Sequence, residues 1–103
     1  MSDADKSSIG TPLDWIRYAE GDLKVAEREI QVELPSYHTV CFLCQGSAEK
    51  FLKAYLISQG WQLEKTHDIL RLLKACVEYN VDMKQLVPQG EILNEYIIGG
   101  RYP

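Results

Sequence analysis

The sequence predicts an all-α protein, an up-and-down antiparallel bundle of four main helices. Apolar residues recur at the three- and four-residue spacing of amphipathic helices, and no stretch alternates between apolar and polar residues as a half-buried strand does. Proline, glycine, serine and asparagine mark the ends of these periodic stretches. The length of 103 residues, the apolar fraction of 46% and the charged fraction of 25% describe one small globular domain.

The first predicted helix covers residues 12–33. Thr11 is suited to cap its start, and Pro12 takes a first-turn position where a missing N–H costs no hydrogen bond. Gly21 lies in the middle of the helix and points to a close approach by a neighbouring backbone. Residues 1–10 are small and polar and are expected to form a flexible N-terminal segment, which leaves 11–103 as the folded domain. The apolar stripe of the helix consists of Leu13, Ile16, Leu23, Ala26 and Ile30.

The second predicted helix covers residues 37–59. Pro35 and Ser36 break the chain and start this helix, and Gly60 ends it as a C-terminal cap. Its first half, residues 37–44, is apolar around nearly its whole circumference, which is typical of a helix at the centre of a bundle or at a subunit interface. The short turn before it makes the first two helices an antiparallel pair.

The third predicted helix covers residues 67–79 and follows a loop over residues 61–66. Thr66 or His67 opens it, and Asn80 closes it. Residues 82–85 resemble a further capping box, and a final helix is expected over residues 89–98, ended by Gly99 and Gly100. The inner face of the third helix consists of Ile69, Leu72, Leu73 and Cys76.

The net charge of −4 argues against indiscriminate binding of nucleic acid, which needs a basic surface. The charge is unevenly spread, because residues 1–33 carry eight acids against four bases, whereas residues 49–74 carry five bases against three acids. Any anion-binding site is therefore expected on the second and third helices. The alternative interpretation is an ordinary solvated surface with uneven charge.

The three cysteines lie within apolar runs, and an odd number without a signal peptide favours a reducing cytoplasm. Cys41 and Cys44 form a CxxC pair, but no second pair of ligands follows at zinc spacing. On a helix the two residues share one face, so two small core residues explain the pair. We expect no metal, no cofactor and no membrane partner.

Polar residues at helical spacing interrupt the apolar second helix. Gln45, Glu49 and Lys53 lie on one face, and glutamate four residues before lysine is the favourable order for an ion pair. One interpretation is a partly buried polar network that fixes the register of the helix. The other is a polar pocket in which Lys50, Lys53 and Arg71 bind the phosphate of a nucleotide or RNA.

Two further residues are candidates for chemistry. His67, next to Asp68 at a helix start, is either a turn residue or an acid–base catalyst, since imidazole titrates near neutrality. Arg101 follows two glycines and either binds phosphate or pairs with an acid of the first helix such as Asp22.

Three blocks together resemble the HEPN family of small helical proteins. The opening helix of that family is similar to residues 15–27, which include Asp22-Leu23 and the later Ala26. The signature of its second helix resembles Gln45-x-x-Ala48-Glu49-Lys50-x-x-Lys53-Ala54, and the start of its third helix resembles His67-Asp68-Ile69-x-x-Leu72-Leu73. The ending Arg101-Tyr102-Pro103 is similar to one branch of the family.

The resemblance implies a helical bundle, usually dimeric, that is often encoded beside a minimal nucleotidyltransferase in two-component modules, many of them toxin–antitoxin pairs. It also implies that active relatives are metal-independent ribonucleases with an Arg-x(4–6)-His motif. Neither His38 nor His67 follows an arginine at that spacing. The first hypothesis is therefore a non-catalytic or weakly active homodimer that acts with a nucleotidyltransferase. The alternatives are a metal-independent ribonuclease that uses His67 with Arg71 or Arg101, and a module that binds nucleotide or RNA through residues 50–74.

Overall fold

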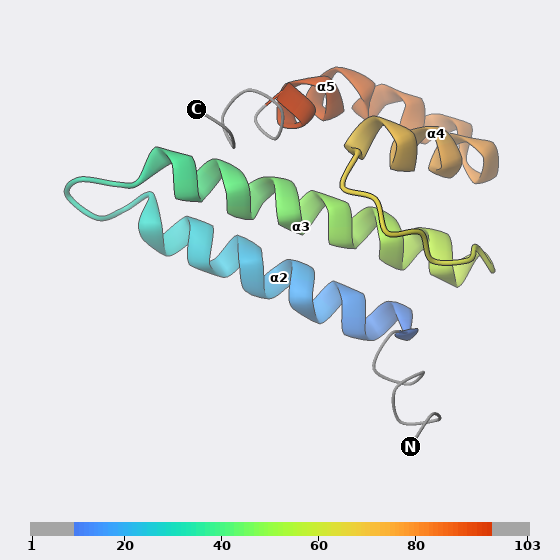
Figure 1. Ribbon diagram of the computed structural model, residues 1–103, viewed down its shortest axis with the longest axis horizontal. Helices are drawn as coiled ribbons and strands as arrows, with labels where there is room; N and C mark the ends of the chain where they lie inside the picture. The colour runs from blue at the N-terminus through green and yellow to red at the C-terminus, as the bar shows by residue number, and fades with distance from the viewer. Residues whose placement is uncertain (1–9, 96–103) are drawn as a thin grey trace.

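The helix α3 (Tyr37–Ser58) forms the middle layer of the molecule and separates two groups of helices. The computed structural model describes residues 10–95. The helix α2 (Pro12–Glu29) packs along one side of α3. The other side is covered by α4 (Ile69–Tyr79) and α5 (Val87–Glu95), and the 3₁₀ helix η1 (Val81–Leu86) packs against these two helices (Figure 1). The prediction of an all-α helical bundle is confirmed.

The start of α2 is as predicted, but its end is not. Thr11 Oγ1 accepts a hydrogen bond from the backbone N–H of Asp14 at 3.1 Å, and Pro12 lies in the first turn. The helix ends at Glu29 rather than at residue 33. The carboxylate of Glu29 accepts the backbone N–H of Ser36 at 2.8 Å across the turn, and the residue before Pro35 is kept out of the helical region by the proline ring.

Both ends of α3 have the caps that the sequence predicts. Ser36 Oγ accepts the backbone N–H of Thr39 at 3.4 Å. After Ser58 the chain makes a Schellman motif, in which Gly60 has a φ of 88° and the N–H of Trp61 bonds to the carbonyl of Leu56 at 3.0 Å. Within residues 10–95 no helix is long and apolar enough to cross a membrane.

Residues 61–68 run back along α3, so that α4 begins beside the middle of that helix (Figure 1). The N-cap of α4 is Asp68, and not Thr66 or His67 as expected. Its Oδ1 atom accepts the backbone N–H groups of Leu70 and Arg71 at 3.0 and 3.2 Å. Asn80 closes the helix as predicted.

The last two elements differ from the prediction in kind and position. Residues 82–85 lie within η1 rather than in a capping box, and Asn80 caps this 3₁₀ helix by accepting the N–H of Asp82 at 3.1 Å. The helix α5 begins at Val87, two residues earlier than expected, because Pro88 fits the first turn, where an N–H has no partner. The predicted residues 96–98 of this helix lie outside the described residues.

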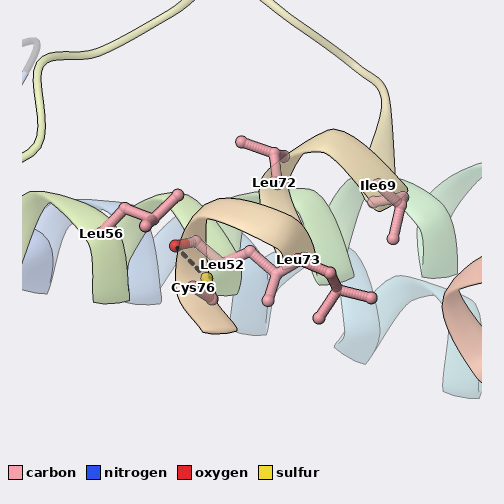
Figure 2. Packing of buried hydrophobic residues seen from close by; sticks show 6 residues of the cluster. All are labelled: Leu52, Leu56, Ile69, Leu72, Leu73 and Cys76. Atoms are coloured by element: carbon pink, nitrogen blue, oxygen red, sulfur yellow. Dashed lines mark hydrogen bonds between the residues drawn. The ribbon is translucent and has the colours of Figure 1, made fainter. Parts of the chain in front are cut away.

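The hydrophobic core lies between α3 and α4 (Figure 2). It consists of Leu52 and Leu56 from α3 and of the four residues predicted as the inner face of the third helix, Ile69, Leu72, Leu73 and Cys76. Burial raises the pKa of the Cys76 thiol to about 11, and its Sγ atom donates to the carbonyl of Leu52 at 3.9 Å. This thiol is therefore protonated near neutral pH and packs as a small apolar side chain.

Small residues line the contact between α2 and α3. Ala19 and Ala26 of α2 are buried, and so are Ser47 and Ala54 of α3. The hydroxyl of Ser47 donates to the carbonyl of Ala19 at 2.7 Å, so the two backbones come close. The larger residues of the predicted α2 stripe stay largely uncovered, since Leu23 is 40% exposed and Ile30 is 45% exposed.

The close helix approach expected at Gly21 occurs elsewhere. Within residues 10–95, no atom of a neighbouring helix lies within 4 Å of a Cβ placed on Gly21, so that expectation is wrong. The tight position is Gly90 of α5, where a Cβ would lie 2.5 Å from Leu73 Cδ1 and 3.3 Å from Ile69 Cγ2. No spacing pattern indicates this contact, because Gly90 lies in a short helix with little amphipathic character.

These two glycines form a matched pair for a stability measurement. Gly90→Ala should lower the free energy of unfolding by about 1 to 3 kcal/mol, because the added methyl group pushes into two buried side chains. Gly21→Ala should raise it by about 0.5 to 1 kcal/mol, because alanine is the better helix former and open space receives the methyl group. Urea unfolding of both variants tests this, and an equal response of the two would contradict the packing.

Candidate functional site

The polar residues of α3 lie inside the molecule. The residue exposures are 3% for Gln45, 7% for Glu49 and 4% for Lys53. All three are on one face of α3, as the spacing predicts, and this face lies next to the connection that leads into α4. We call these residues together with His67 the polar network.

Glu49 is the centre of the polar network, because its carboxylate accepts three hydrogen bonds. Its Oε2 atom accepts from Lys53 Nζ at 2.8 Å. Its Oε1 atom lies 3.2 Å from Gln45 Nε2 and 2.9 Å from His67 Nδ1. Gln45 Nε2 also donates to the backbone carbonyl of His67 at 3.3 Å, so both the ring and the backbone of His67 are held against α3.

Two opposing influences act on the pKa of Glu49. Burial, the largest of them, raises the pKa of this carboxyl group because it disfavours the charged form. The hydrogen bonds and positive charges of Lys53 and His67 outweigh burial, and the net result is a pKa below the usual value of about 4.5. Glu49 is therefore an ionised carboxylate at neutral pH.

The lowered pKa of Glu49 predicts a dependence of stability on acid pH. The folded protein stabilises the ionised form of Glu49 relative to the unfolded chain. This contribution to the free energy of unfolding is present above a pH of about 4.5 and is lost as the pH falls through the lower pKa of the folded state. Urea unfolding between pH 6 and pH 3 should show this loss in the wild type. Glu49→Gln should lack that component, and an identical pH dependence in both proteins would contradict the prediction.

Lys53 connects the polar network to α2. Its Nζ atom lies 5.6 Å from the centre of the Trp15 ring, within the range of a cation–π contact. The sequence suggests Trp15 as a packing residue, and apolar periodicity gives no signal for a contact between its ring and a buried ammonium group. The network thus connects α2, α3 and the segment before α4.

The other basic candidates also have carboxylate partners. Lys50 Nζ pairs with Asp22 Oδ2 at 2.5 Å, on the side of the α2–α3 hairpin where Gly46 leaves room for both side chains. Arg71 is exposed and binds Glu64 through its Nε and Nη2 atoms at 3.0 and 3.4 Å. Beside Arg71 the pKa of the Glu64 carboxyl group is lowered, chiefly by the hydrogen bond.

The structure brings some of the candidate residues together and leaves others apart. Gln45, Glu49, Lys53 and His67 form one connected network, whereas Lys50 and Arg71 each belong to a separate ion pair. Arg101 lies outside the described residues, and so does its suggested pairing with Asp22. Within residues 10–95 no three side chains of the metal-binding types are grouped as a metal site would require.

The N-terminus of α4 is closed by side chains of the protein. Asp68 accepts two of its backbone N–H groups, and Asn94 Oδ1 accepts the N–H of Ile69 at 3.0 Å. Sequence reasoning missed Asn94, because its partner lies 25 residues earlier in the chain. These side chains occupy the donors that a phosphate would need at this helix end.

The polar network is built from residues of α3 and of the segment that leads into α4, which are the segments that resemble the HEPN family in sequence. A comparison with protein-family models matches the HEPN domain over residues 13–103. The chain belongs to the HEPN domain family. Searches of curated proteins and of solved structures each found no significant match. The HEPN match covers all of the described helices from Leu13 onward, including every residue of the polar network.

Proposed function

We propose that this HEPN-domain protein is a non-catalytic or weakly active homodimer that acts with a minimal nucleotidyltransferase in a two-component, toxin–antitoxin-like system. The resemblance to the HEPN family suggests this setting, and the sequence lacks the Arg-x(4–6)-His spacing of the active ribonucleases. The pairing of Lys50, Lys53 and Arg71 with carboxylates supports a role in protein association over a phosphate pocket.

The observation that carries the dimer is an uncovered apolar face on the α2–α3 hairpin. Asp22 pairs with Lys50 on one side of the hairpin, and Trp15, seven residues before Asp22, lies on the same side of α2 and contacts Lys53. Helical geometry places two series with seven-residue spacing on the opposite side. We call these residues the heptad face: Ile16 and Leu23 of α2 and its C-cap residue Ile30, with Tyr37, Cys44 and Phe51 of α3.

The two series of the heptad face lie at matching heights. Since Ser47 bonds to Ala19 in an antiparallel pair, Phe51 lies level with Ile16, Cys44 with Leu23, and Tyr37 with Ile30. None of the six residues is buried, and Phe51 is 39% exposed while Tyr37 is 65% exposed. Two helices of this length present a face of about 600 Å² per copy, which approaches the area of a specific interface.

Charge supports a second copy as the partner of the heptad face. Every charged residue of α3, namely Glu49, Lys50 and Lys53, lies on other sides of that helix. The α3 part of the face is therefore free of charge and can pack against its own symmetry copy without repulsion. A four-helix interface between two hairpins would bury the apolar residues that this chain leaves in water.

Phe51→Glu should convert the dimer to a monomer, because two carboxylates would be buried across the interface. Tyr18→Glu is the matched control, since Tyr18 is 60% exposed and lies on the other side of α2. Size-exclusion chromatography with light scattering should give about twice 11.8 kDa for the wild type and the control, and 11.8 kDa for Phe51→Glu. A monomeric wild type at micromolar concentration would refute the dimer.

The nucleotidyltransferase partner is tested by co-expression. A gene for a minimal nucleotidyltransferase is expected beside the gene for this chain, and the two products should purify together. Phe51→Glu then shows whether the complex needs the dimer. Two products that elute separately at micromolar concentration would contradict this part of the proposal.

A further inference from the structure

His67 combines an exposed imidazole with a buried carboxylate. Its side chain is 66% exposed, whereas the Glu49 side chain that it contacts is 9% exposed. The polar network therefore has one member that reaches the surface. In the structure the ring is held by Glu49, and the backbone is held by Gln45.

The contact with Glu49 determines which nitrogen of His67 is reactive. Glu49 is ionised and can only accept, so Nδ1 must carry the proton of this 2.9 Å hydrogen bond. In the neutral ring the lone pair is then on Nε2, at the opposite edge of the imidazole. A carboxylate on the other nitrogen also stabilises positive charge that develops on the ring.

Four other nucleophiles of the described chain, two cysteines, a lysine and a histidine, are less suited to reaction at neutral pH. Burial raises the pKa of Cys76 to about 11, and burial followed by the nearby Cys41 raises the pKa of Cys44. Lys53 is buried and bound to Glu49. His38 is exposed on α3, but within residues 10–95 its ring has no hydrogen-bond partner to orient it.

Two basic side chains lie near His67 along the chain, whereas the donors of the α4 start beside it are occupied by Asp68 and Asn94. Arg71 lies one turn further on, and its exposed ion pair with Glu64 is of the kind that exchanges readily for another anion. Lys65 lies two residues before His67 in the same connection.

We propose that His67 is a modification site whose Nε2 atom accepts a phosphoryl group from small activated donors of the phosphoramidate class. The Nε2 lone pair attacks phosphorus and forms the N–P bond. The P–N bond of the donor breaks, and its electron pair leaves with ammonia, which already carries its three protons. The ring becomes positively charged and keeps its Nδ1 proton, which Glu49 holds. Glu49 is thus a positioning residue for this reaction.

The test incubates the folded protein with potassium phosphoramidate and follows phosphohistidine by ³¹P nuclear magnetic resonance and peptide mapping. We expect the label on His67 as the Nε2 isomer, with His38 labelled at least about tenfold more slowly. His67→Ala should abolish the fast reaction, and His38→Ala should leave it unchanged. Wild-type protein in urea should label both histidines at one common rate, because the contact with Glu49 is then lost.

Glu49→Gln separates positioning from a merely structural role. The glutamine keeps the size of the side chain but offers an amide in place of the charge, so the labelling rate should fall about tenfold and the Nδ1 isomer should increase. Circular dichroism checks that this variant is folded. The comparison of His67 with His38 in the wild-type protein does not depend on the variant. Equal rates at His38 and His67, or a predominant Nδ1 isomer in the folded wild type, would overturn the proposal. Neither result bears on dimerisation.

Discussion

Replacing Glu49 by leucine is expected to lower the free energy of unfolding by about 3 to 5 kcal/mol. The substitution leaves the Lys53 ammonium buried, with the Trp15 ring as its remaining described contact and no carboxylate to compensate its charge. It also removes the acceptor that Gln45 and His67 share. Urea unfolding at pH 7 measures the loss, which is a large fraction of the stability of a small domain.

The matched control for this variant is Glu64→Leu, which breaks the exposed ion pair with Arg71. Exposed pairs contribute about 0 to 1 kcal/mol, so this variant should unfold close to the wild type. If Glu49→Leu cost no more than Glu64→Leu, Glu49 would not be the buried centre of a network.

The second large effect is expected for Leu72→Ala in the core between α3 and α4. Leu72 is 1% exposed and packs in the cluster with Leu52 and Leu56, so the substitution removes buried methyl groups and leaves a cavity (Figure 2). A loss of about 3 kcal/mol is expected from urea unfolding. Leu34→Ala, at a residue that is 88% exposed, should change the stability by less than about 0.5 kcal/mol. Similar losses at both positions would place the core elsewhere.

Apolar periodicity predicted the parts of the fold that depend on one helix at a time. The inner face of α4 is found as expected, and Gly60 ends α3 through its positive φ. Residue types near the chain breaks did not predict the end of α2 or the start of α4 correctly. The side chain of Glu29 closes the turn after α2, and Asp68 competes successfully with Thr66 and His67 as the cap of α4.

The candidate site was predictable along α3 and not across the fold. The spacing of Gln45, Glu49 and Lys53 indicates a shared face, which the structure has. Their contacts with His67 and Trp15 depend on the path of residues 61–68 and on how far α2 is shifted along α3. The periodicity of apolar residues within one helix predicts neither. Gly90 illustrates the same limit, since only the crossing of α5 over α4 explains it.

The central claim is that Glu49 and Lys53 form a buried ion pair. The most direct test compares the two single variants with the double variant. Glu49→Leu and Lys53→Met each leave one buried charge without its partner, whereas the double variant removes both charges. The double variant should therefore be more stable than either single variant by at least about 2 kcal/mol in urea unfolding at pH 7. Losses that simply add in the double variant would contradict the pair, and with it the account of α3 as the helix that organises this domain.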